Sequence, residues 1–235
     1  MQANFRMFGP IHLAILGSVP SLAAVLAGID RYAPGRSKLL RRGLALVLLL
    51  NSVLLYGYMA MRGWIRFPDG LPLELCDATL CLTFVELLKP TRLVFDLVYY
   101  CALAGTSMAL LTPDLPEPSF SFSTIEFFIT HGLVVVCVLY LVWSKQARPR
   151  DGSIWRAMIG INVYAAALGT FDYIFNTNYM YLRARPVNPS LLNFLGPWPW
   201  YIGASEGVAL LLFTLLYLPF CRSPKHRLPS TKLPI

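Results

Sequence analysis

Blocks of roughly 20 apolar residues recur along this chain, and they constrain its fold more than any other feature. A helix of that length crosses the ~30 Å hydrocarbon layer of a bilayer and satisfies its own backbone hydrogen bonds there. Of the 235 residues, 56% are hydrophobic and 14% are charged, against about 25% charged in a typical soluble domain. The sequence therefore predicts an all-α, polytopic membrane protein.

Seven blocks meet this criterion, of which the third is the shortest and the most polar. The predicted helices are Phe8–Ile29, Gly43–Met61, Leu71–Leu88, Leu93–Leu111, Phe122–Trp143, Ile154–Phe175 and Trp200–Phe220. Residues 1–221 are expected to form one seven-helix transmembrane domain. Residues 222–235 are expected to form a basic, disordered tail.

The positive charges lie mostly in one set of loops. The loops that follow helices one, three, five and seven hold fifteen Lys or Arg residues, and the N-terminus and the other loops hold five. Cytoplasmic loops of membrane proteins carry such an excess, so we expect the N-terminus outside and the C-terminal tail in the cytoplasm. Because the net charge of +8 is spread over short loops, it does not indicate nucleic-acid binding.

The five cysteines are odd in number and form no C-x-x-C pair. This argues against a disulfide framework and against a zinc ribbon. A metal site built from Cys76, His131, His12 and carboxylates lacks any H-x-x-x-H or H-E-x-x-H pattern. We therefore expect no metal and no cofactor.

Ionisable groups inside a membrane are costly, so their position along the helices is informative. They gather in the outer half of the predicted bundle, whereas the inner halves of helices two, five and seven are nearly pure Leu, Val and Phe. With 1.5 Å per residue, Cys76 and His131 lie roughly 8 Å and 14 Å below the outer surface, near enough to meet. The pattern predicts a polar cavity lined by Glu74, Cys76, Asp77, Glu126, Thr130, His131, Asp172, Asn176, Asn178, Glu206 and His12.

Short motifs along the whole chain resemble those of the YwaF-type bacterial integral membrane proteins. The stretch 71–77 reads LPLELCD and is similar to the LPLxLC signature of that group. Further matches are ALLTP at 109–113, FFITHG at 127–132, NYMYL at 178–182 and GPWPWY at 196–201. Relatives often have His where this chain has Glu74. The resemblance implies a multi-pass protein of a bacterial inner or plasma membrane.

The YwaF group is similar to the eukaryotic transmembrane protein 164, described as a phospholipid acyltransferase that uses a cysteine and a histidine. By motif, these two residues correspond to Cys76 and His131. The resemblance thus implies acyl transfer or lipid hydrolysis through a thioester on Cys76, with membrane lipids as substrates. His131 would act as the base, and Glu126 or Asp172 would orient it.

Other interpretations of the same residues stay open. Buried carboxylates with a histidine can also relay protons or bind a solute, which would make the protein a transporter. Against transport, the inner halves of the helices offer few polar groups, and no inverted repeat is visible. A structural role is the simplest alternative for Asp77, Glu126, Asp172 and Glu206, and Asn176 and Asn178 can cap the sixth helix. Protein partners are left unknown by the sequence.

Overall fold

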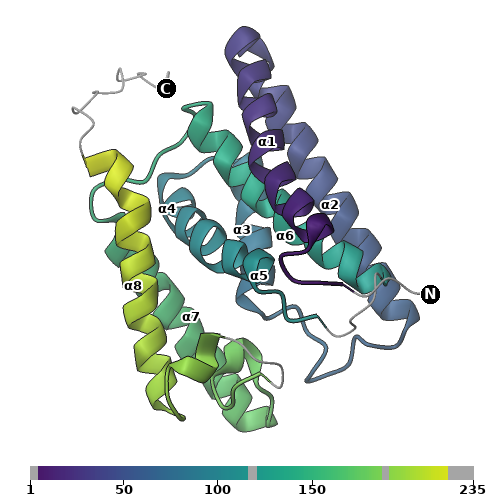
Figure 1. Cartoon of the computed structure of the whole chain (residues 1–235), viewed down its shortest axis with the longest axis vertical. Coiled ribbons are helices and arrows are strands. Elements are labelled where there is room, and N and C mark those ends of the chain that lie inside the picture. The colour runs from purple at the N-terminus through teal and green to yellow at the C-terminus, as the bar shows by residue number, and fades with distance from the viewer. Residues whose placement is uncertain (1–4, 116–120, 187–190, 222–235) are drawn as a thin grey trace, which may run out of the picture.

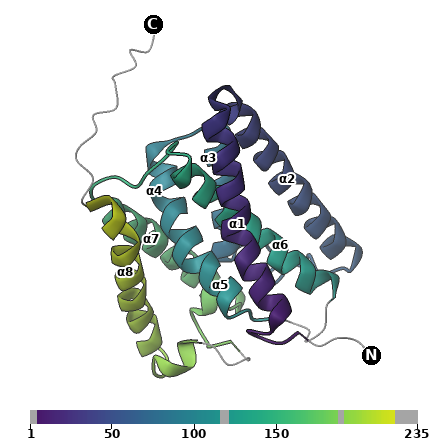
Figure 2. The same cartoon turned by 45° about the horizontal axis from the view of Figure 1, so that its top comes forward.

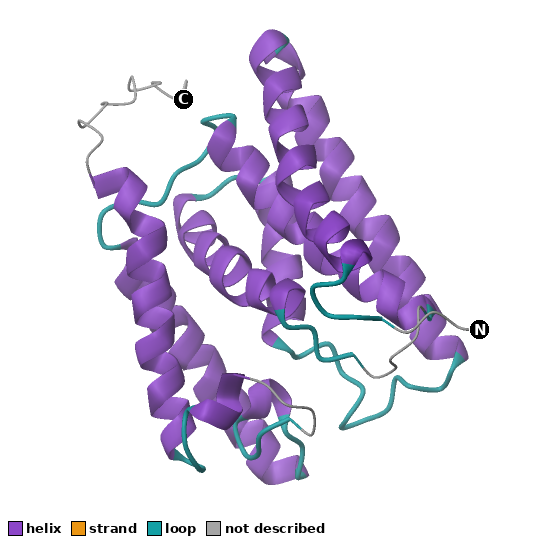
Figure 3. Cartoon of the chain, viewed as in Figure 1, coloured by secondary structure: helices purple, strands orange, loops and turns teal. Residues whose placement is uncertain are grey.

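The computed structural model describes residues 5–115, 121–186 and 191–221, and this part of the chain contains helices and no strands (Figure 3). Residues 222–235, the predicted tail, lie outside it. The long helices are α1 (Pro10–Tyr32), α2 (Ser37–Met61), α3 (Leu75–Leu88), α6 (Phe122–Trp143), α7 (Ser153–Phe175) and α8 (Trp200–Cys221). One further helix combines α4 (Arg92–Tyr100), η2 (Cys101–Thr106) and α5 (Ser107–Leu111). The short turns are η1 (Pro34–Arg36), η3 (Tyr179–Tyr181) and η4 (Leu191–Phe194).

Six of these helices are long and apolar enough to cross a membrane, which confirms six of the seven predicted spans. The exception is α3, which has 14 residues and begins at Leu75 rather than at the predicted Leu71. At 1.5 Å per residue it is about 21 Å long, short of the ~30 Å hydrocarbon layer. The late start has a local cause: Glu74 is extended and forms a reciprocal capping box with Asp77.

The helices form a bundle in which α1 and α2 lie on one side and α7 and α8 on the other (Figures 1 and 2). Between them, α3, η2 and α6 contact one another, and α1 packs along α6. Successive long helices alternate in direction, so the start of α1 and the end of α8 lie at opposite ends of the bundle (Figure 1). Which end faces the cytoplasm stays a prediction.

Ion pairs and caps hold the end of the bundle where α3 stops and α7 starts. Asp96 on α4 is fully buried, and its Oδ2 accepts hydrogen bonds from Arg150 Nη2 at 2.5 Å and Arg156 Nε at 2.8 Å. Arg41 on α2 donates to the carbonyl of Leu87 at 2.7 Å, which caps the last turn of α3. Both ends of the short helix are therefore fixed by side chains.

A close backbone approach in the loop before α3 requires glycine at position 70. A Cβ there would lie 2.1 Å from Trp64 O and 2.5 Å from Arg66 N, so the backbone would have to move. We expect Gly70→Ala to lower the free energy of unfolding by about 2 kcal/mol. Thermal unfolding in detergent micelles measures this loss of stability. Gly57→Ala is the control, because nothing lies within 4 Å of that site and alanine favours a helix. An unchanged midpoint for Gly70→Ala would contradict the prediction.

Candidate functional site

The predicted site residues lie at one end of the bundle, where α3, α6 and α8 begin and α7 ends (lower part of Figure 1). We call this the polar end. The structure divides these residues among six places: the first turn of α3, the α2–α6 contact, the imidazole of His131, the contact of His12 between α1 and α5, the loop after α7, and a separate α7–α8 pair.

Cys76 is the second residue of α3 and is partly buried. Thr106 of η2 is buried, and its hydroxyl donates to Cys101 O at 3.4 Å. Asp77 follows Cys76 on α3. It accepts hydrogen bonds from Tyr56 OH on α2 and from the backbone N–H of Glu74, each 3.0 Å long.

His131 is held by its own helix. Its Nδ1 lies 2.7 Å from the carbonyl oxygen of Phe127, and its ring stacks on the Phe127 ring with centroids 4.0 Å apart. Because a carbonyl only accepts, Nδ1 carries the proton in this contact. The neutral ring then has its lone pair on Nε2, and no described residue donates to that atom. His131 is thus oriented by a backbone carbonyl, not by Glu126 or Asp172 as the sequence analysis expected.

No hydrogen bond joins Cys76 to His131 within the part of the chain that the structure describes. The helices that carry them, α3 and α6, contact each other and η2. Hydrogen bonds between catalytic groups are often long in proteins without substrate and tighten in the complex. The predicted pair therefore lies on adjoining helices at the same end of the bundle.

His12 differs from His131 because both of its ring nitrogens form hydrogen bonds. The backbone N–H of Phe8 donates to Nδ1 at 2.9 Å, so Nε2 carries the proton and donates to Leu110 O at 2.8 Å. The ring is fully buried, and no nitrogen is left for a metal or a substrate. His12 therefore joins the start of α1 to the end of α5.

Glu126 belongs to a network between α2 and α6. Its Oε1 accepts from Asn51 Nδ2 at 3.2 Å and from the Thr130 hydroxyl, and Asn51 also donates to Thr130 Oγ1 at 2.5 Å. These bonds satisfy a buried carboxyl group between two apolar helices. The structure gives Glu126 a role in helix pairing.

Asp172, Asn176 and Asn178 organise the loop that follows α7. Asp172 is fully buried, and its Oδ1 accepts from Thr177 Oγ1 at 2.6 Å and from the backbone N–H of Tyr179 at 2.9 Å. Asn176 ends α7 in the left-handed conformation. Its Oδ1 accepts from Arg183 at 2.8 Å, and Asn178 Oδ1 accepts from the Arg183 N–H at 2.9 Å.

This loop covers the start of α3. The Met180 N–H donates to Glu74 Oε2 at 3.0 Å, and Tyr179 OH donates to Pro68 O at 2.8 Å. A polar cavity of about 140 Å³ lies there, lined by Asp69, Glu74, Thr177, Asn178 and Tyr179. Burial, and then the nearby Asp114 carboxylate, raises the pKa of Tyr181 above its usual range.

Glu206 lies apart from these groups. It accepts a hydrogen bond of 2.9 Å from Asn162 Nδ2, which links α8 to α7. The structure thus brings Glu74, Cys76 and Asp77 together with the loop after α7, and it leaves Glu206 outside. Sequence reasoning missed Tyr56, because it belongs to no motif and reaches Asp77 from α2.

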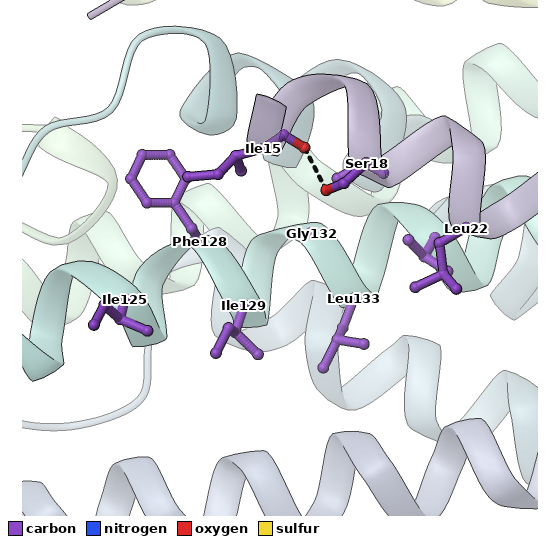
Figure 4. Close-up of a pocket in the computed structure, with 10 residues that line it drawn as sticks. Ile15, Ser18, Leu22, Ile125, Phe128, Ile129, Gly132 and Leu133 are labelled. Atoms are coloured by element: carbon purple, nitrogen blue, oxygen red, sulfur yellow. Dashed lines mark hydrogen bonds between the residues drawn. The ribbon is translucent and has the colours of Figure 1, made fainter. Parts of the chain in front are cut away.

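An open apolar groove of about 570 Å³ runs between α1 and α6 (Figure 4). Its one hydroxyl, on Ser18, donates to Ile15 O at 2.7 Å and so offers no proton to the groove. His131 precedes Gly132 of the groove, and consecutive residues of a helix point about 100° apart. The groove and the imidazole therefore lie at the same depth on different faces of α6. The lining residues are Ile15, Ser18, Val19, Leu22, Ile125, Phe128, Ile129, Gly132, Leu133 and Val136.

Six long apolar helices define a multi-pass membrane protein. Its buried ionisable groups are not confined to the predicted outer half, because Asp30, Glu86 and Asp96 are buried at the opposite end. The chain belongs to the TMEM164 family, whose model matches residues 7–217. That match extends from the segment before α1 into α8 and confirms the resemblance to transmembrane protein 164. It is consistent with the YwaF group. No curated protein and no solved structure matches the chain.

Proposed function

We propose that this protein is a lipid acyltransferase or lipid hydrolase of a bacterial inner or plasma membrane, with Cys76 as nucleophile and His131 as base. The observation that carries the proposal is the hydrogen bonding of the His131 ring, which decides which nitrogen is basic. Its Nδ1 is fixed on the Phe127 carbonyl, so Nε2 is left as the basic atom on the helix that adjoins α3. A histidine held in this way can accept the proton of a thiol.

The reaction would have two steps. In the first, His131 takes the Cys76 proton while Sγ attacks the ester carbonyl of a phospholipid. The ester C–O bond breaks, the leaving lysolipid oxygen takes the proton from His131, and a thioester forms on Cys76. In the second, the hydroxyl of an acceptor lipid, or water, gives its proton to His131 and attacks the thioester. The carbon–sulfur bond of the thioester breaks, and the Cys76 thiolate takes the proton from His131, which restores the thiol.

The apolar groove between α1 and α6 supports lipid substrates. It lies on two helices that can cross a membrane, so its surroundings would be hydrocarbon. Its lining offers contacts to CH₂ groups and no free polar atom, which suits an acyl chain. A chain held there would run along α6 past the depth of His131.

The proposal is tested by trapping the thioester. The chain in nanodiscs is incubated with a phospholipid that carries an alkyne-tagged acyl chain, and labelled peptides are identified by mass spectrometry. We expect label on Cys76 that hydroxylamine removes, because thioesters react with this nucleophile. Cys76→Ala should abolish the label. Cys81→Ala, which removes an exposed cysteine of the same helix, should keep it. Label that survives Cys76→Ala would overturn the proposal.

A further inference from the structure

Helix α2 contacts both helices that carry the proposed pair of Cys76 and His131. It packs against α3, which holds the cysteine, and against α6, which holds the histidine, and α3 and α6 also contact each other. Two polar side chains in the apolar part of α2, Asn51 and Tyr56, form hydrogen bonds across to these helices. They are therefore placed to set how α3 and α6 lie relative to each other.

Tyr56 holds the first turn of α3. Its hydroxyl donates to Asp77 Oδ1 at 3.0 Å, and the other oxygen of the same carboxyl group accepts from the backbone N–H of Glu74 at 3.0 Å. One carboxyl group thus joins α2 to the capping box that begins α3. Asp77 directly follows Cys76 in this turn, so a shift of the turn away from Tyr56 would carry the thiol with it.

Asn51 holds the turn of α6 that leads to His131. Its Nδ2 donates to Thr130 Oγ1 at 2.5 Å and to Glu126 Oε1 at 3.2 Å. These two acceptors are four residues apart and so lie one above the other on the same face of α6. The amide therefore resists both sliding and rotation of this turn. Thr130 directly precedes His131, whose own hydrogen bond goes to Phe127 of the same turn.

We propose that Asn51 and Tyr56 are positioning residues, which hold Cys76 and His131 in the arrangement that acyl transfer needs. This inference rests on the proposed roles of that pair. Each positioning residue bonds to the immediate neighbour of one member of the pair, and both belong to one continuous helix, Ser37–Met61. Helix α2 thus carries the geometry from one member to the other. Such placement matters, because a displacement of reacting groups by about 1 Å can cost about 100-fold in rate.

Tyr56→Phe and Asn51→Ala each remove one of these contacts. We expect each to slow acylation of Cys76 at saturating lipid by about 10-fold in the thioester-trapping experiment, because the base is no longer aligned with the thiol. The mole fraction of lipid that gives half the maximal rate should stay unchanged, since neither residue lines the apolar groove. In a His131→Ala background the further loss should disappear, because no base is left to align.

Tyr58→Phe and Ser52→Ala are the matched controls, because they remove hydroxyls from the same helix. Ser52 donates to Leu48 O of its own helix, and the Tyr58 hydroxyl has no hydrogen bond to α3 or α6 among the described residues. We expect both controls to acylate at the wild-type rate. The inference is overturned if Tyr56→Phe and Asn51→Ala acylate as fast as the controls, or if they slow the His131→Ala protein by the same factor.

A cross-linking measurement separates this inference from the proposed function. In a His131→Cys, Cys81→Ala chain in nanodiscs, a short bifunctional methanethiosulfonate joins position 131 to Cys76, and mass spectrometry identifies the linked peptides. We expect Tyr56→Phe to lower the ratio of cross-linked to singly modified chains, and Tyr58→Phe to leave it unchanged. A lowered ratio without any acylation contradicts the proposed function alone. Acylation with an unchanged ratio contradicts the positioning role alone, and a chain that does not cross-link at all contradicts both.

Discussion

His131→Ala is expected to slow acylation of Cys76 by a factor of at least about 100, which is the usual contribution of a positioned general base. The change should leave stability nearly intact, because the imidazole makes its one described hydrogen bond within its own helix. The rate is measured by thioester trapping over time, and stability by thermal unfolding in micelles. His131→Gln keeps the size and polarity of the side chain and should be equally slow, because it has no basic nitrogen.

His12→Ala is the matched control, and we expect it to lower stability and to leave the rate of acylation intact. This ring is fully buried and bonds to Phe8 N and Leu110 O, so its loss leaves a cavity and two unpaired backbone groups. We expect a loss of about 3 kcal/mol in unfolding free energy, with acylation retained in the fraction that stays folded. Rapid acylation by His131→Ala, or a catalytic defect in a stable His12→Ala protein, would contradict these assignments.

Asp96→Ala is expected to be the most destabilising single change at the other end of the bundle. Asp96 is fully buried and accepts from the backbone N–H and guanidinium of Arg150 and from Arg156 Nε. Removing the carboxylate leaves two cations without their counter-charge and separates α4 from the start of α7. The side chains of Arg150 and Arg156 are 37% and 34% exposed, so water screens the charges left behind, and we expect a cost of about 2–3 kcal/mol.

The effect of Asp96→Ala is measured as the loss of unfolding free energy in micelles. Glu206→Ala is the control, because its bond with the exposed Asn162 should contribute less than about 1 kcal/mol. Arg156→Met should cost less than Asp96→Ala, because Arg150 still neutralises the carboxylate. Equal midpoints for Asp96→Ala and the wild-type chain would rule out this role for the ion pairs.

The long apolar helices were predictable because hydropathy is a local property of the sequence. Six spans were found with ends within three residues of those observed, except that α2 begins at Ser37 and not at the predicted Gly43. The start of α3 was not predicted correctly, because it depends on a capping box between Glu74 and Asp77 rather than on hydropathy. The π-turn at Cys101–Thr106 carries no composition signal either, since its carbonyls are paired by ordinary Thr and Ser side chains.

The candidate site was predictable in depth but not in its lateral arrangement. Counting residues along each helix placed Cys76 and His131 at the same end of the bundle, as the structure does. Helical rise says nothing of which face of α6 meets α3, so the hydrogen-bond partners could not be derived. The orienting group of His131 is a main-chain carbonyl, and sequence patterns do not distinguish one carbonyl from another.

The short α3 also bears on how the chain enters the bilayer during synthesis. A 14-residue segment with polar groups at both ends is a poor substrate for insertion on its own, because it neither spans the hydrocarbon nor buries its terminal backbone groups. Arg41 of the preceding helix caps its last carbonyls, and α2 lies against it. We therefore expect insertion of α3 to depend on α2 already being in place, with the two helices leaving the translocon as a hairpin.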